Sequence, residues 1–129
     1  TKQNQVIVYQ HTGISSNIKL DPALLKNSVI NLISNAIKYS GENTFIEFIT
    51  ELNDSELTIT VKDNGIGIPQ DEQKNLFEPF FRAHNTGNIP GTGLGLNIVK
   101  RYVELMGGTV LCKSAQDKGT TVTLIFTHL

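Results

Sequence analysis

The stretch that decides how the fold is read is NLISNAIKYS, residues 31–40. Asn31, Asn35 and Lys38 recur at positions i, i+4 and i+7, which places three polar side chains on one face of a helix. Asparagine is a mediocre helix former, because its side chain competes for backbone hydrogen bonds. Two asparagines in line beside a lysine therefore need a reason other than helix propensity.

The sequence around this stretch predicts a long helix. Asp21 followed by Pro22 is typical of an N-cap before a proline in the first helical position, and the pattern lasts to about Tyr39. The residues expected on its buried face are Leu25, Val29, Leu32, Ile33, Ala36 and Ile37. The polar residues expected opposite them are Asn27, Ser28, Asn31, Asn35 and Lys38.

Two interpretations of this polar stripe are open. It is compatible with a face that is merely solvated. Carboxamide oxygens also suit Mg²⁺, a hard cation that takes few protein ligands and completes its shell with phosphates and waters. Lys38, one turn further along, could then meet phosphate charge.

The remaining patterns predict further strands and helices. Strand-like segments occupy residues 5–10, 15–21, 44–52 and 56–63, and a short helix is expected near Pro69. A second strong helix is expected from about Leu94 to Met106, followed by a hairpin that turns at 116–119. Residues 1–129 thus read as one α/β domain whose helices lie on one face of a mostly antiparallel sheet.

Composition limits the functions that this chain can have. Its 129 residues are 39% hydrophobic and 18% charged, with a net charge of -1, as expected for one globular domain. Without a basic run, nucleic acid or an anionic membrane is not expected as the primary partner. The single cysteine, Cys112, favours a reducing, cytoplasmic setting. No signal peptide or membrane-spanning run is recognised, and the start inside a strand-like pattern suggests a piece of a longer protein.

The segment DNGIGIP, residues 63–69, places an acid beside a glycine loop. A hairpin is not expected, because Pro69 and a helical pattern follow where a returning strand would be needed. Asp63 should therefore end a strand, next to a loop in which Gly65 and Gly67 let a ligand approach the backbone. An ionised carboxylate there can accept a hydrogen bond from an exocyclic amine. An ordinary turn or helix-cap role for Asp63 is the alternative.

A second glycine segment, GTGLGL, spans residues 91–96. It lacks the Lys-Ser/Thr of a P-loop, and it follows a polar loop where the dinucleotide fingerprint requires a strand. Gly91, Gly93 and Gly95 could expose backbone N–H groups to an anion, or could simply form a flexible start of a helix. The polar residues 82–95 before that helix predict a mobile loop.

The order of four motifs is more specific than any one of them. NLISNAIKYS, DNGIGIP, LFEPFFRA and GTGLGLNIVK closely resemble the N, first-glycine, F and second-glycine boxes of sensor histidine kinases. The resemblance covers essentially the whole chain and implies the catalytic, ATP-binding domain of bacterial two-component systems. It implies a two-layer sandwich in which about three helices cover one face of a mixed, mostly antiparallel five-stranded sheet, with a flexible ATP lid.

The resemblance also implies roles for individual residues. Asp63 would accept the adenine amino group, Gly65 and Gly67 would shape the purine pocket, and Tyr39 would lie against adenine or ribose. Asn35 would hold Mg²⁺. The residues implied near the phosphates are Asn31, Lys38, Arg82 and the lid residues Gly91, Thr92, Gly93, Leu94 and Gly95. The aromatic residues implied to anchor the lid by packing are Phe77, Phe80 and Phe81.

Two positions favour a kinase over the related ATPases. Those relatives carry Glu where this chain has Asn31, and the clamp ATPases carry Asp where it has Lys38. Asn31 cannot act as a general base, which water or serine would need more than a neutral imidazole does. An ATP-hydrolysing or serine-phosphorylating relative and a degenerate interaction module remain the alternatives.

The resemblance finally implies partners. His11, His84 and His128 do not lie in the family's phosphoacceptor motif. The expected acceptor is a histidine on a separate dimerisation domain of the same kinase, with a response regulator downstream. The chain alone is expected to be a cytoplasmic monomer that binds Mg·ATP without phosphorylating itself, and whether the parent protein is membrane-anchored is left open.

Overall fold

The computed structural model describes residues 5–13, 20–42, 44–53, 55–78 and 95–127. The described elements are β1 (Val6–Gly13), α1 (Pro22–Tyr39), β2 (Phe45–Leu52), β3 (Glu56–Asp63), the 3-10 helix η1 (Gln70–Asn75), α2 (Gly95–Leu105), β4 (Thr109–Ala115) and β5 (Gly119–Thr127). The strand predicted at 15–21 is not confirmed: 15–19 lie outside the described residues, and Leu20 is in a bend before the helix.

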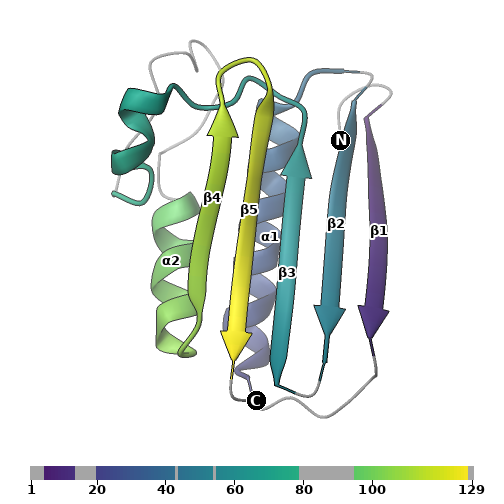
Figure 1. Cartoon of the computed structure of the whole chain (residues 1–129), viewed down its shortest axis with the longest axis vertical. Helices are drawn as coiled ribbons and strands as arrows, with labels where there is room; N and C mark the ends of the chain where they lie inside the picture. Colours follow the sequence, from purple (N-terminus) through teal and green to yellow (C-terminus); the bar gives the residue numbers. More distant parts are fainter. Residues whose placement is uncertain (1–4, 14–19, 43, 54, 79–94, 128–129) are drawn as a thin grey trace.

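The five strands form one sheet in the order β1-β2-β3-β5-β4. β1 runs parallel to β2, and every other neighbouring pair is antiparallel (Figure 1). The predicted hairpin joins β4 to β5 through a turn at 116–118, where Asp117 adopts a positive φ of 63°. The prediction of a mixed, mostly antiparallel five-stranded sheet is confirmed.

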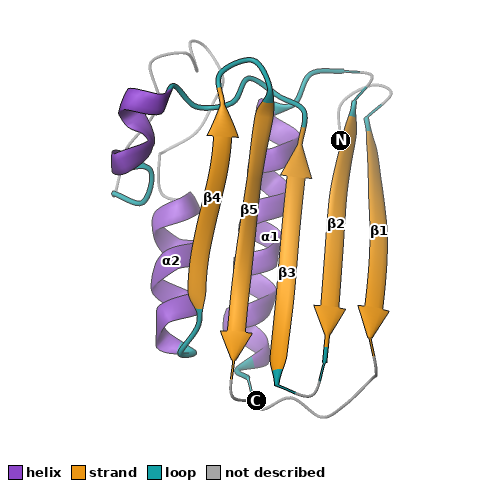
Figure 2. Ribbon diagram, viewed as in Figure 1, coloured by secondary structure: helices purple, strands orange, loops and turns teal. Residues whose placement is uncertain are grey.

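The helices α1 and α2 lie side by side on one face of this sheet, so the fold has two layers (Figure 2). The core lies between the layers. Its most deeply buried members come from both helices and from the facing side of the strands, and they include Leu32, Ala36, Ile46, Val99, Val103, Leu124 and Phe126. Alternation along β3 places Leu57, Ile59 and Val61 in this core.

The start of α1 follows the sequence prediction. Asp21 Oδ1 accepts hydrogen bonds from the backbone N–H groups of Ala23 (2.9 Å) and Leu24 (3.2 Å), and Pro22 occupies the first helical turn. These contacts satisfy donors that have no partner within the helix. Asp21 is therefore the N-cap.

One residue of the predicted polar stripe was assigned to the wrong face. Ser28 is fully buried, in line with Leu32 and Ala36 at spacings of four residues. Its hydroxyl donates to the carbonyl oxygen of Leu24 at 2.8 Å. Because the helix itself satisfies this hydroxyl, Ser28 can face the core, and it does not belong with Asn31 and Asn35.

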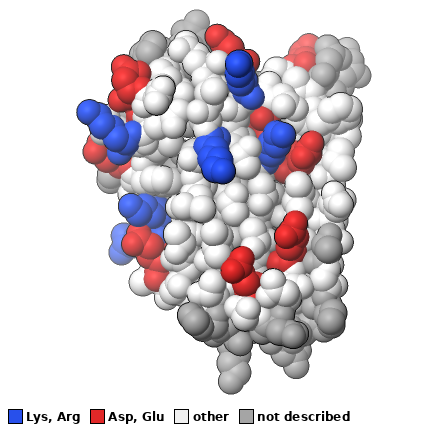
Figure 3. All heavy atoms as spheres, in the orientation of Figure 1, with Lys and Arg blue, Asp and Glu red and all other residues white. Residues whose placement is uncertain are grey.

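The second face of the sheet carries no helix among the described residues. Acidic and basic side chains are interspersed over this side of the molecule, with uncharged residues between them (Figure 3). A surface that attracts a polyanion by charge alone needs a field of one sign, which this view does not show. Within the described ranges, no helix is both long and apolar enough to span a membrane.

Candidate functional site

Several predicted site residues meet at one end of the sandwich. The last turn of α1, the end of β3, the loop 64–69 and the β4–β5 turn lie at the upper end in Figure 1, whereas α2 begins lower, beside α1. This end therefore holds Lys38, Tyr39, Asp63, Gly65 and Gly67, and Asn35 lies next to it on α1, against Gly95 at the start of α2.

Asp63 is the buried acid of this end. It is the last residue of β3, only 8% exposed, and it faces the helices like Val61 two residues before it. Its Oδ1 accepts hydrogen bonds from the N–H groups of Gly65 (2.9 Å) and Thr120 (3.2 Å). Among the described residues no hydrogen bond reaches Oδ2. The second oxygen is thus available to a ligand.

The surroundings of Asp63 oppose its ionisation. Burial raises the pKa of this carboxyl above its ordinary value, because a charge is poorly solvated there. The hydrogen bonds from Gly65 and Thr120 favour the carboxylate and partly offset that rise. A buried carboxylate with a perturbed pKa at the end of a strand is a candidate for a functional residue.

The loop after Asp63 is fixed between α1 and the β4–β5 hairpin. The N–H of Ile66 donates to the carbonyl oxygen of Tyr39 at 3.1 Å, and its carbonyl accepts from Asp117 N–H at 2.6 Å. A β-carbon on Gly65 would collide with the Tyr39 carbonyl, and Gly67 has a φ of 65°. These two glycines are therefore required by close backbone packing, and their purine-pocket role remains a prediction.

Asn35 lies against the first residue of α2. A β-carbon added to Gly95 would be 2.9 Å from Asn35 Nδ2 and 3.0 Å from Oδ1. The missing side chain of Gly95 thus makes room for the carboxamide of Asn35. A carboxamide oxygen is a ligand that Mg²⁺ accepts, so this half-buried group fits the predicted metal role.

The neighbouring members of the polar stripe are placed differently. Asn31 donates from Nδ2 to the carbonyl oxygen of Asn27 at 2.9 Å, so its amide is bound to its own helix. Lys38 is half-buried in the last turn of α1. The other predicted residues, Arg82, Gly91, Thr92, Gly93 and Leu94, together with Phe80, Phe81, His84 and His128, lie outside the described residues.

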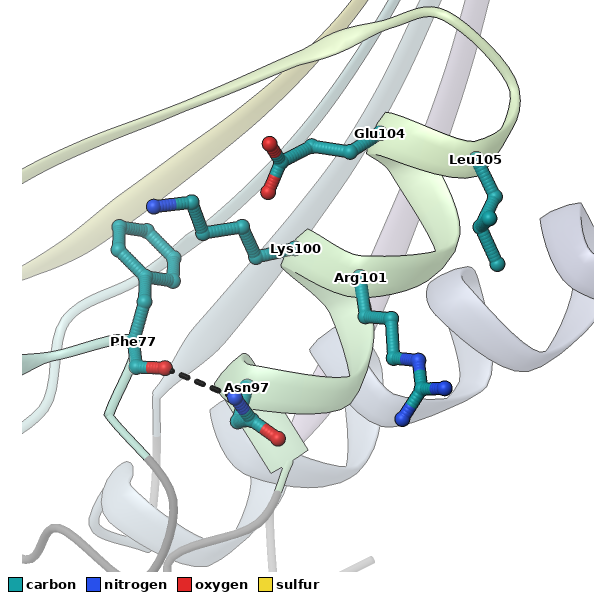
Figure 4. A pocket seen from close by; sticks show the side chains of 6 residues that line it. All are labelled: Phe77, Asn97, Lys100, Arg101, Glu104 and Leu105. Atoms are coloured by element: carbon teal, nitrogen blue, oxygen red, sulfur yellow. Dashed lines mark hydrogen bonds between the residues drawn. The ribbon is translucent and has the colours of Figure 1, made fainter.

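Phe77, predicted to anchor the lid, is held by α2. Asn97 donates from Nδ2 to its carbonyl oxygen at 3.0 Å, and Lys100 Nζ lies 5.4 Å from the centre of its ring (Figure 4). A hollow of about 520 Å³ lies here, lined by Phe77, Asn97, Lys100, Arg101, Glu104 and Leu105. Among the residues that the structure describes, no predicted nucleotide-contacting residue lines this hollow.

Comparison with known proteins shows which family this chain belongs to. A family model described as histidine kinase-, DNA gyrase B- and HSP90-like ATPase matches residues 20–128. The chain belongs to this ATPase family. Virulence sensor protein BvgS of Bordetella bronchiseptica is 40% identical over 114 residues, which are 84% of this chain and 9% of BvgS. Sensor histidine kinase WalK of Bacillus subtilis is 40% identical over 110 residues, 82% of this chain and 18% of WalK.

Solved structures confirm the fold expected for this ATPase family. The mycobacterial sensor histidine kinase MprB aligns with a TM-score of 0.81 and 29% identity, over 94% of this chain and 83% of the other. Full-length ShkA, solved in complex with AMPPNP, aligns with a TM-score of 0.79 and 25% identity, over 97% of this chain and 26% of the other. The predicted resemblance to histidine-kinase catalytic domains is thus confirmed.

Two residues near Asp63 were not predicted from the sequence. Thr120 supplies one of the N–H donors to Asp63, and Cys112 faces the same side of the sheet from β4. Burial, together with the charge of Asp63, raises the pKa of Cys112 to about 11. No local motif marks either residue, because only the strand register brings β3, β5 and β4 together here.

Proposed function

We propose that this chain is the catalytic domain of a longer sensor kinase, which binds Mg·ATP and donates the γ-phosphate to a histidine on a separate dimerisation domain. The observation that carries the proposal is the buried Asp63, whose Oδ1 is held by two backbone N–H groups while Oδ2 is left for a ligand. Family membership and the AMPPNP complex of the similar ShkA support a nucleotide as that ligand.

The adenine end of the proposed site is built around Asp63. Adenine carries an exocyclic amine, and a carboxylate oxygen is an acceptor suited to it. The loop that begins at Gly65 is fixed to α1 and to the hairpin, so Asp63 need not reorganise when the base binds. Tyr39, whose carbonyl oxygen receives the N–H of Ile66, lies beside that loop and is proposed to contact adenine or ribose.

The phosphate end is proposed to lie between α1 and the start of α2. Asn35 would hold Mg²⁺ through its carboxamide oxygen, and Lys38 would meet the negative charge of the phosphates. Bound Mg²⁺ supplies charge neutralisation to the triphosphate. Asn31, Arg82 and the residues 91–95 are proposed to complete the phosphate contacts.

The reaction itself needs positioning more than covalent chemistry from this chain. A ring nitrogen of the acceptor imidazole, neutral and carrying a lone pair, forms a bond to the γ-phosphorus. The bond from that phosphorus to the β,γ-bridging oxygen breaks, and ADP leaves. Because the nucleophile brings its own lone pair, the site needs no carboxylate base, which agrees with an asparagine at position 31.

Incubating the chain with γ-labelled ATP tests this assignment. We expect neither acid-labile phosphate on the chain nor steady release of inorganic phosphate, because the acceptor histidine is on another domain. Adding an excess of histidine-containing dimerisation domain from the parent kinase should then produce acid-labile, alkali-stable phosphate on that domain. Steady hydrolysis by the chain alone would instead identify a water-hydrolysing relative. No transfer with intact nucleotide binding would point to an interaction module.

A further inference from the structure

A row of polar residues crosses three strands at the site. Ser114 of β4 is paired with Thr120 of β5, and Thr120 is paired with Asp63 of β3. Residues in register on neighbouring strands point to the same face of a sheet, so all three side chains face the helices. Ser114 is thus two strands away from the proposed adenine acceptor, in the same row.

The Ser114 hydroxyl has three hydrogen-bond partners, which is as many as a hydroxyl can bind with its one proton and two lone pairs. It donates to the carbonyl oxygen of Gly119 at 3.0 Å and accepts from the N–H of Ile68 at 2.8 Å. Thr120 Oγ1 lies 2.8 Å away. A hydroxyl has one proton and two lone pairs, so the proton given to Gly119 requires that Thr120 donates to Ser114.

These hydrogen bonds connect Ser114 to both segments that donate a backbone N–H to Asp63, namely the start of β5 and the loop 64–69. On one side, Thr120 gives its hydroxyl proton to Ser114 and its backbone N–H to Asp63 Oδ1. On the other side, Ser114 holds Ile68, at the end of the loop whose beginning, Gly65, donates to the same Oδ1. The serine hydroxyl therefore joins the two segments that orient the carboxylate.

Gln73 of η1 closes the same network. Its Nε2 donates to the carbonyl oxygen of Ser114 at 2.7 Å and to that of Ile68 at 3.0 Å. The side chain thus fastens η1 to both β4 and the loop. Gln70, in the same short helix, is exposed and offers a comparison residue of identical chemistry.

We infer that Ser114 and Gln73 are positioning residues, which fix Asp63 and the loop 64–69 for recognition of the nucleotide base. The inference rests on the proposed function, because it assigns the base-binding end of that same site. Neither residue needs to touch the nucleotide. Their contribution should therefore appear in the discrimination between bases, while the triphosphate contacts are left intact.

The test compares binding of non-hydrolysable ATP and GTP analogues to the chain and its variants. Ser114→Ala should weaken ATP-analogue binding about five- to tenfold, the effect of one net hydrogen bond. Binding of the GTP analogue, held by its phosphates, should change less than twofold. Ser114→Thr, which keeps the hydroxyl, should restore the preference for ATP. Thr121→Ala, on the opposite face of the same sheet, is the matched control.

Gln73→Met keeps the length of the side chain but removes its donors, and should lower the ATP preference in the same direction as Ser114→Ala. Gln70→Met is its control. If Ser114→Ala does not fold, the comparison of Gln73→Met with Gln70→Met still tests the inference. Equal losses for both nucleotides, or an unchanged preference in both variants, would overturn the inference. Failure of the unaltered chain to bind either nucleotide would instead overturn the proposed function, and the inference with it.

Discussion

The carboxamide of Asn35 on α1 occupies the space that a side chain on Gly95 of α2 would need, with Nδ2 2.9 Å and Oδ1 3.0 Å from the position of such a β-carbon. The two residues are 60 positions apart in the sequence. The Asn35 carboxamide can keep its position only while residue 95 has no side chain. The proposed magnesium ligand and the last glycine of the second glycine segment are therefore parts of one arrangement.

Replacing Gly95 with Ala should displace the Asn35 carboxamide and weaken magnesium-dependent nucleotide binding by about tenfold or more, as for loss of one charge-assisted contact. Stability should change little, because the atoms that must move are the end of a side chain and alanine favours helix. Titration calorimetry with Mg²⁺, beside a thermal melt, measures both effects. Gly41→Ala is the control, since nothing lies within 4 Å of a β-carbon there. Unchanged magnesium dependence in Gly95→Ala would contradict the proposed role of Asn35.

Acidification should weaken nucleotide binding at a higher pH than an ordinary aspartate would cause. Burial raises the pKa of Asp63, and the protonated carboxyl is a weaker acceptor for the adenine amine. The comparison uses the ratio of the nucleotide affinities of the unaltered chain and Asp63→Asn. Titration of the nucleotide phosphates affects both affinities equally and therefore cancels in this ratio. This ratio should be largest near neutral pH and fall as the pH drops toward and through the raised pKa. A ratio that does not change with pH would show that Asp63 does not accept from the base.

The same raised pKa fixes the sign of a stability effect. Between the ordinary pKa and the raised one, the native state binds more protons than the unfolded state, so the contribution of Asp63 to stability decreases as the pH rises. Asp63→Asn keeps an acceptor for Gly65 and Thr120 and removes this dependence. We therefore expect Asp63→Asn to melt no lower than the unaltered chain at neutral pH. A large loss of stability in denaturant titrations would indicate that the carboxylate itself holds the fold.

Cys112 should resist alkylation while the chain is folded. Its pKa of about 11 leaves about one thiolate in a thousand at pH 8, whereas an ordinary cysteine is substantially ionised there. Iodoacetamide labelling followed by mass spectrometry should be slow in buffer and fast in denaturant. Asp63→Asn should accelerate labelling of the folded chain, because the charge of Asp63 contributes to the raised pKa. Equal rates for the folded and unfolded chains would refute this account of Cys112.

The cap of α1 offers a test of the fold that is separate from the nucleotide site. Asp21→Ala removes the acceptor of two backbone N–H groups and should lower the free energy of unfolding by about 1 kcal/mol. Asp21→Ser, which can still cap, should recover most of that loss in urea titrations. If Asp21→Ala and Asp21→Ser were equally stable, the capping bonds would contribute nothing measurable.

The parts of this structure that depend on local chemistry could be predicted from the sequence. The Asp21-Pro22 start, the apolar stripe of α1 and the alternation along β3 are written in neighbouring residues, and the position of Asp63 followed from them. Ser28 was misplaced because its chemistry suggests solvent, while its spacing from Leu32 and Ala36 puts it in the core. The prediction follows the polar character of serine and neglects its helical spacing. Burial costs little here, because the Ser28 hydroxyl donates to the carbonyl oxygen of Leu24 in the same helix.

The parts that depend on register could not be predicted. The sequence explains Gly65 and Gly67 by the approach of a ligand, and it gives no sign that the backbones of Tyr39 and Ala115 also lie against them. Ser114, Gln73 and Thr120 surround Asp63 or its loop only because η1, the ends of β3 and β4 and the start of β5 lie at the same place. A single sequence carries no local signal for such contacts.

The most direct test of the central claim is isothermal titration of the chain with a non-hydrolysable ATP analogue, with and without Mg²⁺, beside Asp63→Asn. We predict binding that Mg²⁺ strengthens and that Asp63→Asn weakens about ten- to a hundredfold, as for loss of a charged hydrogen bond. No binding by the unaltered chain, folded by circular dichroism, or equal affinity in Asp63→Asn, would contradict the account.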